Sequence, residues 1–291
     1  MYQIHGYRDA ADFAAMQKLA SRLWLQQAPY AYMLPGDLAW WRAATPDDSS
    51  IHSAELWRCG DDLVGFTWRV DGDVDFLADT AIPGLVQEML THIAATTPSE
   101  GVVWAFGRHT DRTTILEALG YTRGEAGFRM HLMDPRNATA VPLPPDWHVE
   151  KLAPTLSATT ERAAAQRSAF QSTKMTTERY AFARTLPGYS PEWDMVLRDP
   201  AGTIISFVTI WVDAATQTAL FEPVGCIHVY KRQGWARRLL CTALVKLAEA
   251  GITTASVLSD PPSAAHPAGW LYESCGFHPI DTLYQWNRVQ K

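Results

Sequence analysis

Basic side chains surround a glycine at a turn between a predicted strand and a predicted helix. Lys231, Arg232, Arg237 and Arg238 flank Gly234 in the run KRQGWARR. Glycine leaves neighbouring backbone N–H groups open to a ligand, and the start of a helix adds unpaired donors and the positive end of a dipole. The combination is typical of a phosphate-binding turn, although a glycine beside basic residues is as often only a solvated corner.

The helix after this turn is predicted by apolar residues at i, i+3, i+4 and i+7 spacing, namely Ala236, Leu239, Leu240, Ala243, Leu244, Leu247 and Ala248. Gly251 stands where such a helix commonly ends. Before the turn, residues 221–226 (FEPVGC) have the character of a strand. The phosphate loops GxxxxGK[ST] and GxGxxG are both absent from the sequence, so a different phosphate-binding turn is expected.

Two motifs together resemble the GNAT superfamily of N-acetyltransferases. The acetyl-CoA loop of that family has the pattern [QR]xxGx[GA], which here reads KRQGWA at 231–236, with lysine in place of the usual first residue. The segment LYESCGF at 271–277 resembles the second signature, a helix that carries a tyrosine and ends at Gly-Phe. The segments FEPVG at 221–225 and WVD at 211–213 are similar to segments of a tandem bacterial subgroup of this family. The resemblance covers residues 146–291 well and the earlier half weakly.

The resemblance implies acetyl-CoA as co-substrate and a primary amine, from a small molecule or a peptide, as acceptor. The pantetheine arm would pair with the strand edge at Val224 and Cys226. The pyrophosphate would lie on the loop, which the resemblance assigns to Lys231, Arg232, Gln233, Gly234, Trp235, Ala236 and Arg237.

Three residues are candidates for proton transfer in the implied reaction. Glu222, on the strand before the loop, is the nearest base for the amine; the alternative is a carboxylate that only pairs with an arginine. His228 is a second candidate base, although its place opposite the usual proline of the family favours a loop role. Tyr272 matches the general acid of the family, and with a reference pKa of about 10 it stays protonated at neutral pH. The alternative for Tyr272 is a tyrosine that only packs.

The chain contains an internal repeat. Hairpin patterns at 55–70 and 194–212 are each followed by a helical stripe, and ILEALGY at 115–121 corresponds to LYESCGF at 271–277. Residues 134–147 hold four prolines, as a linker would. We therefore predict an α/β (α+β) protein of two tandem GNAT-like domains, 1–142 and 143–291, each a mixed, mostly antiparallel sheet flanked by helices.

The first domain is expected to be degenerate, without the acetyl-CoA loop. Before its helix, Pro83 lacks a backbone donor, and Ile82 and Leu85 replace basic residues, so no glycine loop is expected there. When the two halves are aligned, Leu116 occupies the position that corresponds to Tyr272. Residues 1–140 carry 11 basic and 18 acidic side chains, whereas the later residues carry 14 and 13. An anionic cofactor would prefer the second half. If the acidic surface of the first half borders the cleft, it would attract a cationic amine; the alternative is an acidic face that serves only solubility.

The composition and sequence argue against several other classes of function. The chain has 291 residues, 47% of them hydrophobic, and a net charge of −6, which argues against nucleic acid as a partner. Apolar runs long enough to span a membrane and a secretory signal are both missing from the sequence, so a cytoplasmic location without membrane contact is expected. The four cysteines lack CxxC spacing and HExxH is absent, so neither a disulfide nor a metal site is expected.

Three classes of function remain open from the sequence. The first is an acetyl-CoA-dependent N-acetyltransferase whose active site lies in the C-terminal domain. The second is a non-catalytic acyl-CoA sensor, which would bind the cofactor without a working base and acid. The third is a protein-interaction module, which would bind no cofactor. The oligomeric state is left open.

Overall fold

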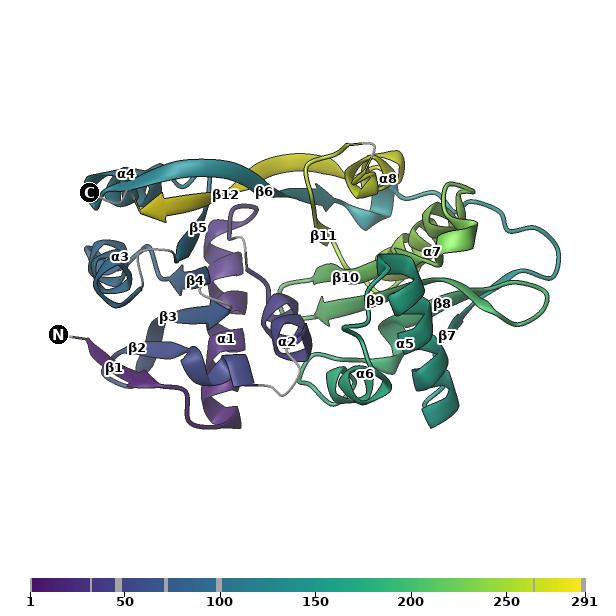
Figure 1. Cartoon of the computed structure of the whole chain (residues 1–291), viewed down its shortest axis with the longest axis horizontal. Coiled ribbons are helices and arrows are strands. Elements are labelled where there is room, and N and C mark those ends of the chain that lie inside the picture. The colour runs from purple at the N-terminus through teal and green to yellow at the C-terminus, as the bar shows by residue number, and fades with distance from the viewer. Residues whose placement is uncertain are drawn as a thin grey trace.

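The computed structural model of the chain describes residues 2–31, 33–44, 49–70, 73–97, 101–263 and 265–288 (Figure 1). Its strands are β1 (Gln3–Gly6), β2 (Glu55–Cys59), β3 (Asp62–Val70), β4 (Asp73–Ala78), β5 (Val102–Phe106), β6 (Tyr121–Met133), β7 (His148–Lys151), β8 (Asp194–Arg198), β9 (Ile204–Asp213), β10 (Thr218–Cys226), β11 (Thr254–Ser259) and β12 (His278–Arg288). They form one mixed sheet in the order β1-β2-β3-β4-β5-β12-β6-β11-β10-β9-β8-β7.

Eight α-helices occur among these residues. They are α1 (Ala10–Gln27), α2 (Pro35–Ala44), α3 (Leu85–Thr96), α4 (Thr110–Ala118), α5 (Leu156–Phe170), α6 (Thr177–Ala183), α7 (Trp235–Glu249) and α8 (Ala268–Ser274). The first four belong to the first half of the chain and the last four to the second. Helices and strands alternate in the same order in both halves, so the predicted fold class and internal repeat are confirmed.

The helix predicted after the basic turn is α7. Its buried residues are Leu239, Leu240, Cys241, Ala243, Leu244 and Leu247, most of them from the predicted apolar stripe. Gly251, which follows the helix, has a φ of 81°, the left-handed conformation that only glycine adopts readily. Leu244 and its neighbours pack in one apolar cluster with Phe221 of β10, which fixes the turn before α7 against the sheet.

The two halves exchange their closing strands. The last strand of the chain, β12, pairs with β5 of the first half, while β6 of the first half pairs with β11 of the second. β6 and β12 pair with each other at the middle of the sheet. Residue 142 lies between β6 and β7, where the chain crosses to the second half. The domain division there stays a prediction, because the sheet itself is continuous across the two halves.

The first half keeps the backbone turn that precedes α7. Gly84 caps the start of α3 with φ 79° and ψ −10°, and Gly234 caps the start of α7 with φ 83° and ψ 6°. The expectation that the first half lacks a glycine turn is therefore wrong. The halves differ at this point in their side chains and in the missing N–H of Pro83.

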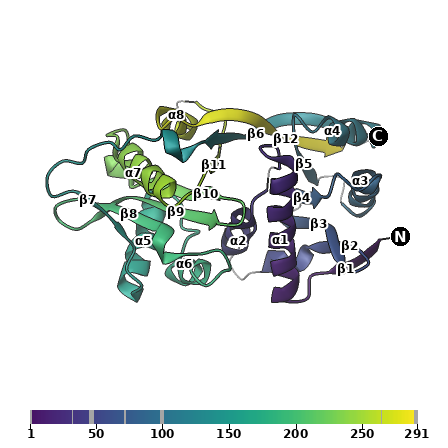
Figure 2. The ribbon, with the colours of Figure 1, turned by 180° about the vertical axis from the view of Figure 1, so that it is seen from behind.

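Helix α2 of the first half packs on strands of the second half. Gly36, near the start of α2, lies so close to Trp211 of β9 that a Cβ at this position would collide with the Trp211 Cβ. Trp211 and Leu220 belong to the same buried cluster as Leu38 of α2. Both views place α2 between β3–β4 on one side and β9–β10 on the other (Figure 1, Figure 2). The interior of the molecule is thus built from both halves.

Candidate active site

β10 and β11 diverge in the second half. The two strands run parallel and pair only from Thr218↔Thr254 to Leu220↔Ser256. Beyond Leu220, β10 stays paired with β9 as far as Cys226↔Ser206, while its other edge has no partner strand among the described residues. A strand edge of this kind can accept an extended ligand as an added strand. Val224 and Cys226, which the sequence assigned to the pantetheine arm, lie in this part of β10.

Glu222 lies where the pairing of β10 with β9 is irregular. The register shifts between Phe221 and Val224, so Glu222 belongs to a local bulge. The indole Nε1–H of Trp211 donates a hydrogen bond of 2.7 Å to the carbonyl oxygen of Glu222, which fixes the backbone of this bulge. Ion pairs to the Glu222 carboxylate are absent among the described residues, so the alternative of a carboxylate paired with an arginine finds no support.

The pKa of the Glu222 carboxyl group is raised. Burial raises the pKa of Glu222 to about 8, and the nearby carboxylate of Asp37 adds to this shift. Desolvation and a like charge both disfavour the ionised form of a carboxyl group. A carboxyl with a pKa near neutrality is matched to proton exchange with an amine.

Tyr272 of α8 shares this site with Glu222. Burial raises the pKa of Tyr272 well above its usual range, and the next largest cause is the charge of Glu222. The ring of Tyr272 packs at 6.1 Å from His131 of β6 and at 5.9 Å from Phe277. Its hydroxyl makes no hydrogen bond to any residue in the described part of the chain. The structure therefore places the predicted base and the predicted acid near each other.

The loop before α7 has the backbone of an anion-binding turn. Arg232 has a φ of 62° and Gly234 a φ of 83°, so two left-handed residues alternate at this point. Side-chain capping of the first turn of α7 is absent within the described residues. Free N–H groups at a helix start attract negative charge, and alternating left-handed residues direct successive N–H groups toward one point.

Two basic side chains of the loop are used within the protein. Lys231 Nζ donates a hydrogen bond of 2.6 Å to the carbonyl oxygen of Ala169 in α5. Arg237 Nε donates at 3.1 Å to the carbonyl oxygen of Ser274, at the end of α8. These contacts hold the loop to the two helices beside it. Both contacts use side-chain donors only, and Ala236 adds only a methyl group to the first turn of α7.

Trp235 packs against the connection between the halves. Its ring stacks on Trp147 with the centroids 3.7 Å apart and an angle of 3° between the planes. Its Nε1–H donates to Oε1 of Gln233, whose Nε2 in turn donates to the carbonyl oxygen of Val229. Trp235 and Gln233, both assigned to cofactor binding from the sequence, thus shape the loop through their side chains.

Two carboxyl groups that the sequence did not single out lie in the interior between the halves. Asp37 is in the first turn of α2 and Asp75 is in β4. Burial raises the pKa of each to about 7. The sequence signal for them was the excess of acidic residues in the first half, and an overall charge does not point to particular residues. Both line a cavity with Tyr30, Trp41, Phe76, Trp104 and Phe106.

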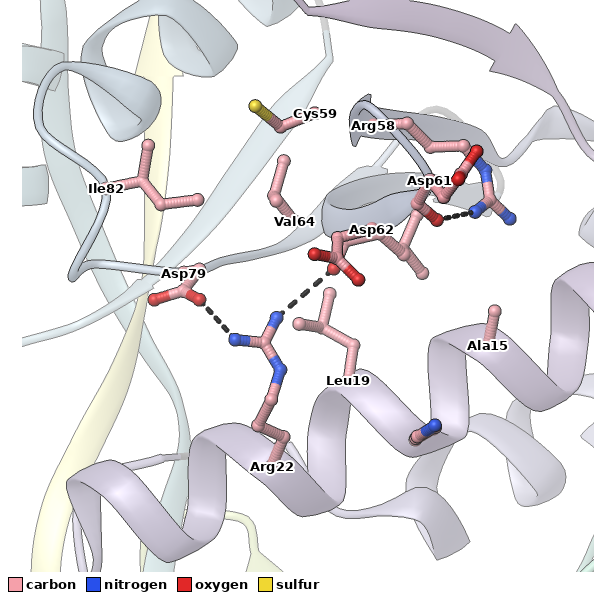
Figure 3. A pocket seen from close by; sticks show the side chains of 12 residues that line it. Ala15, Leu19, Arg22, Arg58, Cys59, Asp61, Asp62, Val64, Asp79 and Ile82 are labelled. Atoms are coloured by element: carbon pink, nitrogen blue, oxygen red, sulfur yellow. Dashed lines mark hydrogen bonds and ion pairs between the residues drawn. The ribbon is translucent and has the colours of Figure 1, made fainter.

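A larger cavity, of about 570 Å³, lies wholly in the first half (Figure 3). It separates α1 from the turn between β2 and β3. Two arginines of its lining have partners there: Arg22 forms an ion pair with Asp79, and Arg58 donates to the backbone carbonyl oxygen of Asp61. Residues assigned to the site from the sequence are absent from its lining, so this cavity is separate from the Glu222–Tyr272 site.

Clusters of three or more histidine, cysteine, aspartate or glutamate side chains arranged for a metal ion are absent from the described residues. Helices long and apolar enough to cross a membrane are likewise absent from that part of the chain. All four cysteines, at 59, 226, 241 and 275, are free.

Comparison with known proteins identifies the fold. Protein-family models and curated proteins give no match to the chain. Among solved structures, a GCN5-related N-acetyltransferase from Sphaerobacter thermophilus has a TM-score of 0.61 at 17% identity, covering 99% of this chain and 95% of its own. A tandem GNAT protein from the clavulanic acid biosynthesis pathway has a TM-score of 0.67 at 14% identity, with 98% of each chain covered.

A third structure agrees with these two. An acetyltransferase of the GNAT family from Colwellia psychrerythraea has a TM-score of 0.67 at 13% identity, covering 99% of this chain and all of its own. The similarity therefore extends over both halves of the chain and not only over the half that carries the two motifs. The protein has the tandem GNAT fold.

Proposed function

We propose that the protein is an acetyl-CoA-dependent N-acetyltransferase with its active site in the second half. The observation that carries the proposal is the proximity of Glu222 and Tyr272 beside the diverging strands β10 and β11, next to the uncapped start of α7. Each part alone has a purely structural explanation. Together they supply a base, an acid, a strand edge and an anion-binding turn in one place.

The residues present fit acetyl-CoA. The uncapped first turn of α7, with the left-handed Gly234, suits the pyrophosphate, and the open edge of β10 at Val224 and Cys226 suits the amide groups of pantetheine. When bound, acetyl-CoA supplies a thioester whose carbonyl carbon is open to attack by an amine. A Cβ at Gly234 would lie 2.9 Å from Nη1 of Arg238, a flexible end that can move aside, so the turn needs glycine chiefly for its left-handed backbone conformation.

Glu222 holds the proton that the acceptor amine must lose. An amine attacks only as the neutral base, and it becomes an amide after losing a further proton. Because the pKa of Glu222 is raised to about 8, its carboxylate is a stronger base than an exposed glutamate would be. The bulge at Phe221–Val224 and the hydrogen bond from Trp211 fix the backbone from which this carboxylate projects.

Tyr272 supplies a proton to the sulfur that leaves. Its hydroxyl stays protonated at neutral pH because burial and the charge of Glu222 both raise its pKa. The hydroxyl also has no partner among the described residues that would compete for the proton. The reaction forms a C–N bond and breaks a C–S bond, and the proton lost by the amine balances the proton gained by the thiol.

The test measures cofactor binding and turnover separately. Acetyl-CoA at about 100 times its dissociation constant should raise the apparent stability of the protein by about 2.7 kcal/mol in a thermal-shift titration. Thiol release with a panel of amines then measures turnover. Tyr272→Phe and Glu222→Gln should each lower kcat at least tenfold and leave the acetyl-CoA shift in place. Glu273→Gln, on the exposed carboxylate next to Tyr272, is the matched control.

The outcomes separate the three function classes. A thermal shift without thiol release from any amine would support the acyl-CoA sensor. The interaction module predicts neither shift nor release. If Glu273→Gln lowered turnover as much as Glu222→Gln does, the assignment of Glu222 as base would be wrong.

A further inference from the structure

Three carboxyl groups lie near the contact between the two halves: Asp37 and Asp75 line one cavity, and Glu222, outside that lining, is close enough to Asp37 for their charges to interact. Glu222 comes from β10 of the second half, whereas Asp37 in α2 and Asp75 in β4 come from the first. Basic partners for these three groups are absent among the described residues. Asp37 is only 6% exposed. Its Oδ2 accepts a hydrogen bond of 2.7 Å from the N–H of Leu34, and its Oδ1 has no donor in the described part of the chain.

The three groups act on one another through their charges. Asp37 is the charged group that raises the pKa of Glu222, and Asp37 also raises the pKa of Asp75, together with Asp73. The charge of Asp37 therefore acts on both the proposed catalytic base and Asp75. Buried carboxylates without counter-ions are costly, and proteins retain them where a ligand or a metal ion supplies the opposite charge.

The cavity at Asp37 and Asp75 has aromatic walls. Trp41 of α2 and Trp104 of β5 line it, with Tyr30, Phe76 and Phe106. Aromatic faces beside carboxylates attract ammonium groups. The cavity volume of about 50 Å³ accommodates a group of one or two water volumes, since a water occupies about 30 Å³. An ammonium group fits this space.

An arginine and a histidine also line the cavity. The Arg112 guanidinium lies 4.7 Å from the centroid of the Phe76 ring. Burial lowers the pKa of His109 to about 3, so this imidazole stays neutral. The charges that act on Asp75 are those of Asp73 and Asp37, both negative, and Nε1–H of Trp104 donates to Asp73 at 3.1 Å. The end of the cavity at Asp37 and Asp75 is therefore acidic.

We propose that this cavity binds the second ammonium group of a linear diamine or polyamine whose reacting amine lies at Glu222. The proposal rests on the proposed N-acetyltransferase function, which it deepens by naming the acceptor class. Asp37 and Asp75 bind the distal ammonium, and the aromatic walls exclude bulkier or branched acceptors. The first half thus recognises the acceptor for a reaction that takes place in the second half.

The first experiment compares chain lengths. Initial rates are measured with α,ω-diaminoalkanes from three to eight carbons and with n-alkyl monoamines of the same lengths, at saturating acetyl-CoA. We expect at least a tenfold higher kcat/KM for the best diamine than for its matched monoamine, with one preferred length. Equal values for diamines and monoamines at every length would overturn the proposal.

The second experiment removes one charge at a time. Asp75→Asn should lower the diamine-to-monoamine ratio of kcat/KM at least tenfold, mostly through KM. Asp62→Asn is the matched control, because it removes an exposed negative charge from the same half at the rim of the other cavity. An equal fall of the ratio in Asp62→Asn would assign the preference to general electrostatic attraction and contradict a built site. Circular dichroism verifies that both variants are folded.

A binding measurement distinguishes failure of this inference from failure of the proposed function. Calorimetric titration with 1,4-diaminobutane and 1,8-diaminooctane in the absence of acetyl-CoA needs no turnover. Binding that is lost in Asp75→Asn and retained in Asp62→Asn supports the cavity even if acetylation is never observed. Acetylation of monoamines without diamine binding would keep the proposed function and overturn this inference.

Discussion

Trp211 and Glu222 are joined across the irregular part of the β9–β10 pairing, where the indole Nε1–H donates to the Glu222 carbonyl oxygen at 2.7 Å. The same indole side chain packs against Gly36 at the start of α2. Trp211 thus connects the backbone of the proposed base with the helix that carries Asp37. Through this one side chain, the packing between the halves fixes both carboxyl groups.

Replacing Trp211 by phenylalanine should therefore impair catalysis more than cofactor binding. Trp211→Phe keeps an aromatic ring against Gly36 and removes the donor to the Glu222 carbonyl oxygen, which costs about 1–3 kcal/mol when the acceptor is buried. We expect kcat to fall about tenfold while the dissociation constant for acetyl-CoA changes less than twofold. Steady-state kinetics with calorimetric binding checks this. A matching loss of acetyl-CoA affinity would contradict the positioning role.

Stability should depend on pH through Asp37. The pKa of Asp37 is about 7 in the folded protein and near 3.8 in the unfolded chain. Between these two pH values the folded state binds more protons than the unfolded state, so the protein loses stability as the pH rises from about 4 to about 7. The penalty at pH 8 has an upper bound of about 4 kcal/mol, because one pKa unit corresponds to about 1.4 kcal/mol. Asp37→Asn can keep the acceptor for Leu34 N–H and removes the charge.

Asp37→Asn should accordingly raise the melting temperature at pH 8 and leave it nearly unchanged at pH 4. Thermal unfolding of both proteins across this range measures the difference. Asp37→Ala, which also removes the hydrogen bond to Leu34, should gain less at pH 8 and lose stability at pH 4. A wild-type protein more stable than Asp37→Asn at pH 8 would show that Asp37 is paired with a cation in the folded state.

The pH dependence of turnover should report Glu222. A base with a pKa of about 8 is mostly protonated at pH 7, so kcat/KM should rise with pH through about 8 before any loss at higher pH. Because the Asp37 carboxylate contributes to this raised pKa, Asp37→Asn should move the rising limb to lower pH. Initial rates with a monoamine acceptor between pH 6 and 9.5 measure the limb. If kcat/KM of Glu222→Gln rose with pH as it does in the wild-type protein, Glu222 would be excluded as the group that causes this rise.

Two left-handed glycines at opposite ends of α7 allow a matched test of the cofactor loop. Gly234→Ala and Gly251→Ala each place a side chain at a φ near 80°, at a cost of about 1–2 kcal/mol of stability. Only Gly234 lies at the proposed pyrophosphate turn, where the new Cβ would also meet Arg238. We expect Gly234→Ala to weaken acetyl-CoA binding at least tenfold. Gly251→Ala, whose Cβ meets open space, should keep the affinity; equal losses in both variants would refute the loop assignment.

Local patterns in the sequence predicted what neighbouring residues determine. The apolar stripe from Ala236, together with Gly251, predicted α7, and both hairpins were found where their turn residues placed them. The Tyr-to-Gly-Phe segment predicted a short helix carrying Tyr272, which the structure confirms as α8. Period and turn chemistry are local properties, so a single sequence contains them in full.

Properties that depend on distant contacts were not predictable in the same way. Asp37 follows Pro-Gly at a helix start, where an acidic residue commonly favours the helix dipole, so nothing local distinguishes it from an ordinary capping residue. Its meeting with Glu222 depends on how α2 packs against Trp211. The glycine turn at Gly84 was missed because Pro83 and the apolar neighbours concealed the similarity to Gly234. The exchange of β6 and β12 follows from pairing between residues more than 100 positions apart.

The strand exchange predicts that neither half is stable alone. A fragment of residues 1–142 lacks β12, which lies between β5 and β6 in the whole protein, and so exposes two strand edges and part of its core. A fragment of residues 143–291 lacks β6, the partner of β11. We expect each fragment alone to be aggregated or poorly protected from hydrogen exchange, and co-expression to give a folded one-to-one complex. Size-exclusion chromatography with amide-exchange mass spectrometry measures both. A folded, monomeric 143–291 fragment that binds acetyl-CoA as the whole chain does would contradict the prediction, because β11 would then need no partner from the first half.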